Sequence, residues 1–218
     1  MNPEDIAIFL RSHPQFFDQH PELLETIHVP HPYGGRAIPL AERQTVALRG
    51  KVKLVEGKLA ELIHFGEEND AISEKVHRLA VALVGARDFP ALAQSLYFHL
   101  REDFAVPHVA LRVWGKSVPV DFQEAEAVTE AQRHHADSLS APQCGPASST
   151  PPANPFLPWF RDAAEHVRSV ALVPLGQTAV FGLLALGSED PQRFYPEMGT
   201  LYLRRIGELC AAGVSARL

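Results

Sequence analysis

One long segment without proline constrains the fold more than any other feature of the sequence. Between Leu40 and Val84 no proline occurs and glycine occurs three times. A continuous helix of about 45 residues would be about 65 Å long, because an α-helix rises about 1.5 Å per residue. This length exceeds the width of a domain built from the rest of the chain. The segment therefore predicts a helix that pairs with a second helix.

Apolar residues along this segment follow the spacing of a coiled coil. They recur at alternating steps of four and three, which places their side chains on the seam that meets a partner helix. Two consecutive steps of three shift the phase once, as a stammer does. Asn69 falls in the second run, where a single asparagine can fix the register. The first run is Leu48, Val52, Val55, Leu59 and Leu62, and the second is Phe65, Asn69, Ile72, Val76, Leu79 and Leu83.

We therefore predict a parallel homodimer formed through this helix. The alternative is an amphipathic helix that folds back on its own domain. The domains predicted from this pattern are an N-terminal helical cluster with a linker at 1–36, a dimerisation helix at 37–85 and a globular domain at 86–218. The linker is predicted from the prolines and the Gly-Gly pair in residues 27–39, which suit neither a helix nor a central strand.

Two His-Pro pairs punctuate the N-terminal segment "SHPQFFDQHPELL". Proline fits the first turn of a helix, and the residue before proline is disfavoured in the helical conformation. The pattern predicts two short helices with His13 and His20 as N-caps. A preceding helix is predicted with Asn2 as its N-cap, Pro3 in its first turn and two acidic residues after it.

The same histidines raise the question of a metal site. His13, His20, His28 and His31 lie within nineteen residues, and four imidazoles could suffice for zinc. Their spacing gives no i, i+4 pair on a helix, and no cysteine or clear carboxylate completes the set. Capping and turn geometry explain them better, so we expect no metal and no cofactor.

Composition and charge restrict the class of protein. The net charge is −6, so no broad basic surface favours nucleic acid. The longest apolar run, residues 179–187, is far shorter than the roughly 20 residues that span a bilayer. The N-terminus lacks the basic start of a signal peptide, and two cysteines are too few for a disulfide framework. These features predict a cytoplasmic protein that binds neither membrane nor nucleic acid.

The order of elements after residue 85 predicts an α+β fold. Helix, strand, helical insert, strand, strand and helix follow one another, which suits an antiparallel sheet with the terminal helices packed on one face. Asp88 is the expected cap of the first of these helices. The elements expected are helices at 86–104, 124–139 and 196–218, strands at 106–115, 168–175 and 180–188, and a loop at 141–155.

Two stretches resemble known families. The segment "VFGLLALGSEDPQRFYPEMGTLYLRRIGELCAAGV" is similar to the closing part of a GAF domain. Over nearly its full length, the chain also resembles an uncharacterised bacterial family, the domain of unknown function 484. "FLRSHPQFFDQHPELL", "PHPYGG", "EEND" and a Cys-Gly pair carry this second resemblance. It implies a GAF-like fold and no particular activity.

The GAF resemblance implies a ligand pocket between the sheet and the helical insert. Strand alternation places Arg112 and Trp114 on one face of the strand at 106–115, toward the insert. Phe156, Trp159 and Cys144 are expected to join them. An arginine beside aromatic rings can bind an anionic or planar ligand. The open alternative is a closed core in which the arginine reaches solvent.

Cys144 is the one candidate for covalent chemistry. The stretch "QCGPA" resembles part of the GAF-type free-methionine-sulfoxide reductases, and a thiol in a polar loop can be reactive. Those enzymes use further cysteines, and the chain offers only Cys210. The acidic pair Glu124 and Glu126 is interpreted as a solvated helix face. We predict a non-catalytic sensor or adaptor that acts on a partner protein; a redox enzyme and a purely structural dimer remain alternatives.

Overall fold

The computed structural model describes residues 2–29, 38–115, 121–148, 154–176 and 179–218. The chain divides into two compact units, Met1–Glu68 and Asn69–Leu218, and each is described by itself. Helix α4 (Leu40–Gly85) begins in the first unit and ends in the second. No helix in the described part of the chain combines the length and the apolar character that a membrane span requires.

The first unit starts with three short helices. Asn2 precedes the first of them, and its backbone N–H donates to Asp5 Oδ2 at 3.0 Å, as in a capping box. The predicted cap at Asn2 is therefore confirmed. Neither of the first two helices buries a residue, so they have no core of their own. The elements are α1 (Pro3–Ser12), α2 (Phe16–Gln19), α3 (Glu22–Thr26) and an antiparallel pair, β1 (His28–Val29) with β2 (Ile38–Pro39).

The two His-Pro histidines end helices rather than begin them. His13 and His20 are the C-caps of α1 and α2, and their backbone N–H groups donate to Phe9 O at 3.0 Å and Phe16 O at 3.1 Å. The N-cap prediction is therefore wrong. Proline excludes its predecessor from the helical conformation, which ends the preceding helix as effectively as it begins the next. Among the described residues no group of three or more metal-binding side chains forms, and His31 lies outside them.

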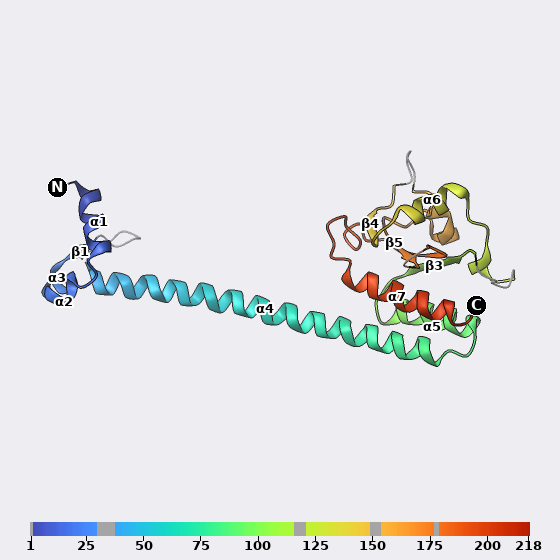
Figure 1. Cartoon of the computed structure of the whole chain (residues 1–218), viewed down its shortest axis with the longest axis horizontal. Coiled ribbons are helices and arrows are strands. Elements are labelled where there is room, and N and C mark those ends of the chain that lie inside the picture. The colour runs from blue at the N-terminus through green and yellow to red at the C-terminus, as the bar shows by residue number, and fades with distance from the viewer. Residues whose placement is uncertain (1, 30–37, 116–120, 149–153, 177–178) are drawn as a thin grey trace. The chain divides into compact units, whose positions relative to one another are not determined.

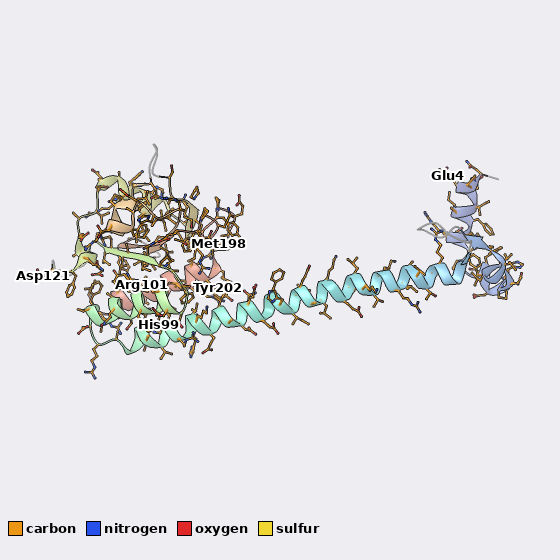
Figure 2. All side chains as sticks on the ribbon, turned by 180° about the vertical axis from the view of Figure 1, so that it is seen from behind. Glu4, His99, Arg101, Asp121, Met198 and Tyr202 are labelled. Atoms are coloured by element: carbon orange, nitrogen blue, oxygen red, sulfur yellow. The ribbon has the colours of Figure 1, made fainter. Side chains whose placement is uncertain are left out.

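The first coiled-coil run is uncovered within the first unit. All five of its side chains, from Leu48 to Leu62, are more than half exposed. Figure 2 shows side chains standing free along this part of α4. Such a row of exposed aliphatic groups is unusual on a helix that needs no partner. The homodimer stays a prediction.

The end of the second run is not a seam for a partner helix. Leu79 and Leu83 are fully buried in the second unit, in the core cluster that also contains residues of the sheet and the last helix. Asn69 accepts a hydrogen bond at its backbone oxygen from the Tyr202 hydroxyl at 3.0 Å. The seam prediction is therefore wrong at these positions. Periodicity identifies an apolar face, and here that face packs on the chain's own helices.

The second unit is built on a four-stranded antiparallel sheet with strand order β3-β6-β5-β4. The predicted α+β fold class is confirmed. Every residue of β6 is buried, as its continuous apolar sequence indicates. The residues expected in the β5–β6 turn include 177–178, which lie outside the described residues. The strands are β3 (His108–Val113), β4 (Gln143–Pro146), β5 (Ser169–Leu175) and β6 (Gly182–Ser188).

Helices cover both faces of the sheet (Figure 1). One face packs against α5 (Phe89–Glu102), α7 (Leu201–Ser215) and the end of α4. The other face carries α6 (Glu130–Ser138) and the 3-10 helix η2 (Leu157–Ala163). A second 3-10 helix, η1 (Gln123–Ala125), lies beside the edge strand β3, where Glu124 bonds to Tyr97 of α5. Asp88 Oδ1 accepts from the Ala91 N–H at 2.9 Å, which confirms this cap.

Three predicted boundaries differ from the structure. The helix expected at 124–139 is split into η1 and α6, because Thr129 caps a new helix by accepting from the Gln132 N–H at 3.3 Å. The loop expected at 141–155 contains β4, which pairs with β5. The last helix begins at Leu201 instead of Pro196.

Candidate functional site

Arg112 is the most deeply buried charged side chain that faces the insert. It lies on β3, an edge strand of the sheet, and the residue is only 3% exposed. Its Nη2 donates to Glu126 Oε2 at 2.5 Å and its Nη1 donates to Leu111 O at 2.9 Å. The guanidinium lies over the Trp159 ring, 5.4 Å from the centroid. Burial of a charge is costly unless it is paired, so this arrangement holds Arg112 in place.

Arg112 has more donors than the protein uses. A guanidinium carries five N–H donors, and the described residues give Arg112 the two hydrogen bonds to Glu126 and Leu111. Arg112 also lines a cavity, in which water or a bound acceptor can accept from its remaining N–H groups.

Glu126 joins a second arginine to the first. Its Oε1 accepts from Arg161 Nη2 at 2.5 Å, so one carboxylate bridges two guanidinium groups. Arg161 has φ 53° and ψ −125°, a conformation that L-residues rarely adopt, within η2. Strained backbone of this kind is concentrated at functional sites.

A buried Tyr–Glu pair lies next to the arginines. The Tyr97 hydroxyl donates to Glu124 Oε1 at 2.5 Å, and Glu124 is 3% exposed. Burial, followed by the bond to Glu124, raises the pKa of Tyr97 far above its usual range. The hydroxyl therefore stays protonated at neutral pH and acts as a fixed donor to the carboxylate.

The cavity beside Arg112 is small and polar. Its volume is about 150 Å³, which is room for about five water molecules at about 30 Å³ each. Pockets for drug-sized ligands have about 300–1,000 Å³. The space suits a small anion and excludes a nucleotide or a tetrapyrrole in this conformation. The polar residues that line it are Tyr97, Arg101, His108, Arg112, Gln123 and Arg161.

Two of the five predicted site residues line this cavity. Arg112 and Trp159 do so. Trp114 lies at the other end of the layer, where its Nε1 donates to Val180 O at 3.2 Å. Phe156 is fully buried and packs edge-on against Trp159, with centroids 5.0 Å apart. It supports the Trp159 ring from within the core.

Cys144 lies apart from Arg112 and Trp159, but it lines a pocket of about 480 Å³ at the β4 edge together with Phe156. It lies on β4 opposite Ala171 and belongs to the core layer on the α5 and α7 side, whereas Trp159 belongs to the opposite layer. The residue is 8% exposed, and burial raises the pKa of its thiol. The expectation of an exposed thiol in a polar loop is therefore wrong. The Cys144 side chain points inward because it lies on the short strand β4.

We expect both cysteines to resist thiol reagents in the folded protein. Burial raises the pKa of Cys210 to about 12 and also raises that of Cys144. Because the thiolate is the reactive form, only a small fraction of either cysteine is reactive at pH 8. Titration with a chromogenic disulfide should be slow in buffer and reach both thiols quickly in denaturant. Rapid modification of Cys144 in buffer would restore the redox alternative.

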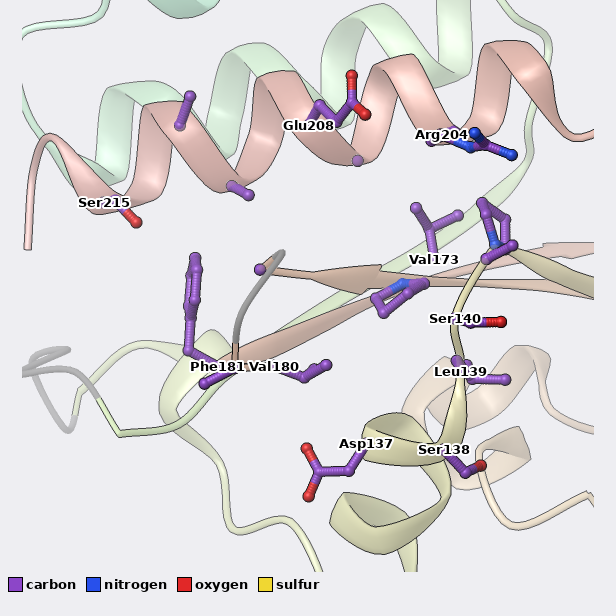
Figure 3. Close-up of a pocket in the computed structure, with 18 residues that line it drawn as sticks. Asp137, Ser138, Leu139, Ser140, Val173, Val180, Phe181, Arg204, Glu208 and Ser215 are labelled. Carbon is purple, nitrogen blue, oxygen red and sulfur yellow. The ribbon is translucent and has the colours of Figure 1, made fainter.

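A larger groove lies where the end of α6 faces α7 across the end of β5 (Figure 3). It has a volume of about 910 Å³ and is lined by α7, residues 137–142, the end of β5 and residues 176 and 179–181. Its charged α7 residues, Arg204 and Glu208, are exposed. Because no buried polar group converges on it, the groove offers less to fix a ligand than the Arg112 cavity does.

The sequence did not reveal the carboxylates of the site. Glu124 and Glu126 were expected on a solvated helix face, but Glu124 is buried and Glu126 pairs with two arginines. A strand arginine on an apolar face signals that a carboxylate must lie nearby. Nothing in the local pattern identifies which one, since Arg161 is 35 residues away from Glu126.

The family can now be stated. The family model described as "Protein of unknown function, DUF484" matches residues 1–215. The chain belongs to the DUF484 family. This DUF484 protein is 24% identical over 203 residues to the uncharacterised protein YigA of Salmonella typhimurium, covering 92% of the chain and 86% of YigA. The corresponding YigA of Escherichia coli is 23% identical over the same length.

Solved structures similar to the DUF484 protein include GAF domains. An A. aeolicus NLH2 GAF domain matches with a TM-score of 0.48 and 13% identity, covering 69% of this chain and 99% of that one. A free methionine-R-sulfoxide reductase from Neisseria meningitidis matches with a TM-score of 0.45 and 18% identity, covering 67% and 89%. With TM-scores below 0.5, these matches describe a distant likeness of architecture and say nothing about ligands or reactions.

Proposed function

We propose that this DUF484 protein is a non-catalytic, dimeric sensor or adaptor that binds a small anion beside Arg112. The observation that carries the proposal is the buried guanidinium with unused donors at a cavity of about 150 Å³. Arg101 and Arg161 line the same cavity, so the local charge favours an anion.

The surroundings of the cysteines support a non-catalytic role. Cys144 lies across the sheet from Arg112, and burial raises the pKa of both thiols. An activated thiol needs a base or a positive charge that lowers its pKa. Within the described part of the chain, neither cysteine makes an ion pair or hydrogen bond that would do so.

The exposed apolar surface of the first unit supports dimerisation and a protein partner. The run from Leu48 to Leu62 offers a seam for a second copy. Helix α1 leaves Ile6, Ile8 and Phe9 at least two-fifths exposed, which suits contact with another protein. In this proposal no residue has a catalytic role, so the sensor acts by changing the state of its partner protein.

Thermal unfolding with small anions tests the proposal. A ligand at 100 times its Kd stabilises the folded state by about 2.7 kcal/mol, which raises Tm by about 5–10 °C in a chain of this size. We expect such a shift with at least one small carboxylate or phosphate in a panel. Arg112→Met should abolish it.

Two further variants complete the thermal-unfolding test. Arg161→Met should weaken the response, and its exposed side chain makes misfolding a minor concern. Arg204→Met removes a cation from the groove of Figure 3 and should leave the response unchanged. A panel without any shift, or a shift that Arg204→Met removes and Arg112→Met does not, would contradict the proposal.

A further inference from the structure

We propose that Glu126 is a built-in occupant of the arginine site and that a small carboxylate binds by displacing it. This inference rests on the proposed function and deepens it, since it names the ligand class and the group that regulates access. The carboxylate of Glu126 already makes the contacts that such a ligand would make, with one oxygen at Arg112 and the other at Arg161.

The two acidic residues of the site differ in how firmly they are held. Glu124 is 3% exposed and accepts from Tyr97 at 2.5 Å and from Gln123 at 3.2 Å. The side chain of Glu126 is 48% exposed, and among the described residues it pairs with the two arginines alone. Glu126 can therefore turn into water without uncovering apolar surface, whereas Glu124 is fixed in the core.

The backbone around Glu126 is suited to such a movement. Glu126 is the residue that ends η1, and no regular element follows until Thr129 caps α6. The side chain thus projects from a short connection between two anchored points. Arg161 has a positive φ and supplies the second guanidinium from a side chain that is 59% exposed. Burial therefore fixes Arg112, whereas Glu126 and Arg161 lie on the solvent side of the site.

The remaining cation defines the ligand more closely. Arg101 lines the cavity and has no ion pair within the described part of the chain. A carboxylate that takes the place of Glu126 leaves Arg101 free for a second negative group. The cavity volume of about 150 Å³ limits the carbon chain between the two groups. We therefore assign the site to short dicarboxylates, for which succinate is a suitable probe.

Calorimetric titration of the full chain tests the displacement. Sodium succinate and inorganic phosphate are titrated at constant ionic strength into the wild type, Glu126→Gln and Glu130→Gln. Glu126→Gln removes the competing charge and should tighten succinate binding at least about tenfold, within the range usual for coupled sites. Glu130 is an exposed residue of α6, so Glu130→Gln removes the same charge elsewhere and should bind as the wild type does.

The other possible results of the titration show whether the displacement, the ligand class or the anion site itself is wrong. Equal succinate affinity in the wild type and Glu126→Gln overturns the displacement and leaves the proposed anion site standing. Weaker binding by Glu126→Gln also overturns it, because Glu126 would then help to hold the ligand. An equal gain for phosphate overturns the assignment to carboxylates. No binding of either anion by any variant overturns the anion site itself, and with it this inference.

Discussion

Leu59→Glu is expected to convert the proposed dimer into a monomer. Leu59 occupies a seam position of the first coiled-coil run, and its side chain is more than half exposed within its own chain. In the proposed dimer the change removes apolar contact worth about 2–5 kcal/mol per site. It also places two like charges at the seam. Because each 1.4 kcal/mol changes Kd tenfold, the Kd of the dimer should rise more than about a thousandfold.

Sedimentation velocity at micromolar concentration measures this change. The matched control is Ala60→Glu, which introduces the same residue one position away from the seam on the exposed surface of α4. Glutamate is a good helix former, so neither variant should break the helix. A wild-type monomer, or a Leu59→Glu variant that remains dimeric, would show that the exposed row serves another purpose.

Leu79→Ala should destabilise the second unit by about 3 kcal/mol, as expected for truncating a fully buried leucine. Leu79 is 0% exposed and belongs to the core formed with α5, α7 and the sheet. Urea unfolding in the Leu59→Glu background measures this effect without a contribution from dimer dissociation.

Val81→Ala provides the control for Leu79→Ala. Val81 lies on the same helix but is 59% exposed, so its truncation should change the free energy of unfolding by no more than about 0.5 kcal/mol. If Leu79→Ala affected dimerisation and left unfolding unchanged, the end of α4 would belong to the seam, as the heptad pattern suggested.

Much of the fold could be predicted because its signals are local. The Asp88 cap, the alternation along β3 and the continuous apolar sequence of β6 all depend on near neighbours in the chain. What covers an apolar face depends on distant residues. For that reason the heptad pattern could not separate Leu59, which is exposed, from Leu79, which is buried on the chain's own core.

Prediction of the site was limited in the same way, by contacts between residues distant in the sequence. Strand alternation placed Arg112 on the face of the insert, and Trp159, expected there from the GAF resemblance, lies beside it. The carboxylate partner of Arg112, Glu126, lies 14 residues away, in a segment whose sequence indicates only polarity. Cys144 was misplaced because a four-residue edge strand leaves little trace in a segment rich in proline and serine.

The dimer and the anion site are separate parts of the account. A dimer without an anion site would be a scaffold, and an anion site without a dimer would be a monomeric binding protein. Sensing requires that the ligand prefer one of two conformations. Displacement of Glu126 supplies such a difference in the connection that joins η1 to α6.

Hydrogen exchange of the full wild-type chain, with and without saturating succinate, tests the central claim most directly. The account predicts slower amide exchange in β3 and in η2, which carry Arg112 and Arg161, and unchanged exchange in α7 along the groove of Figure 3. Exchange that succinate leaves unchanged throughout, or slows only in α7, would contradict it.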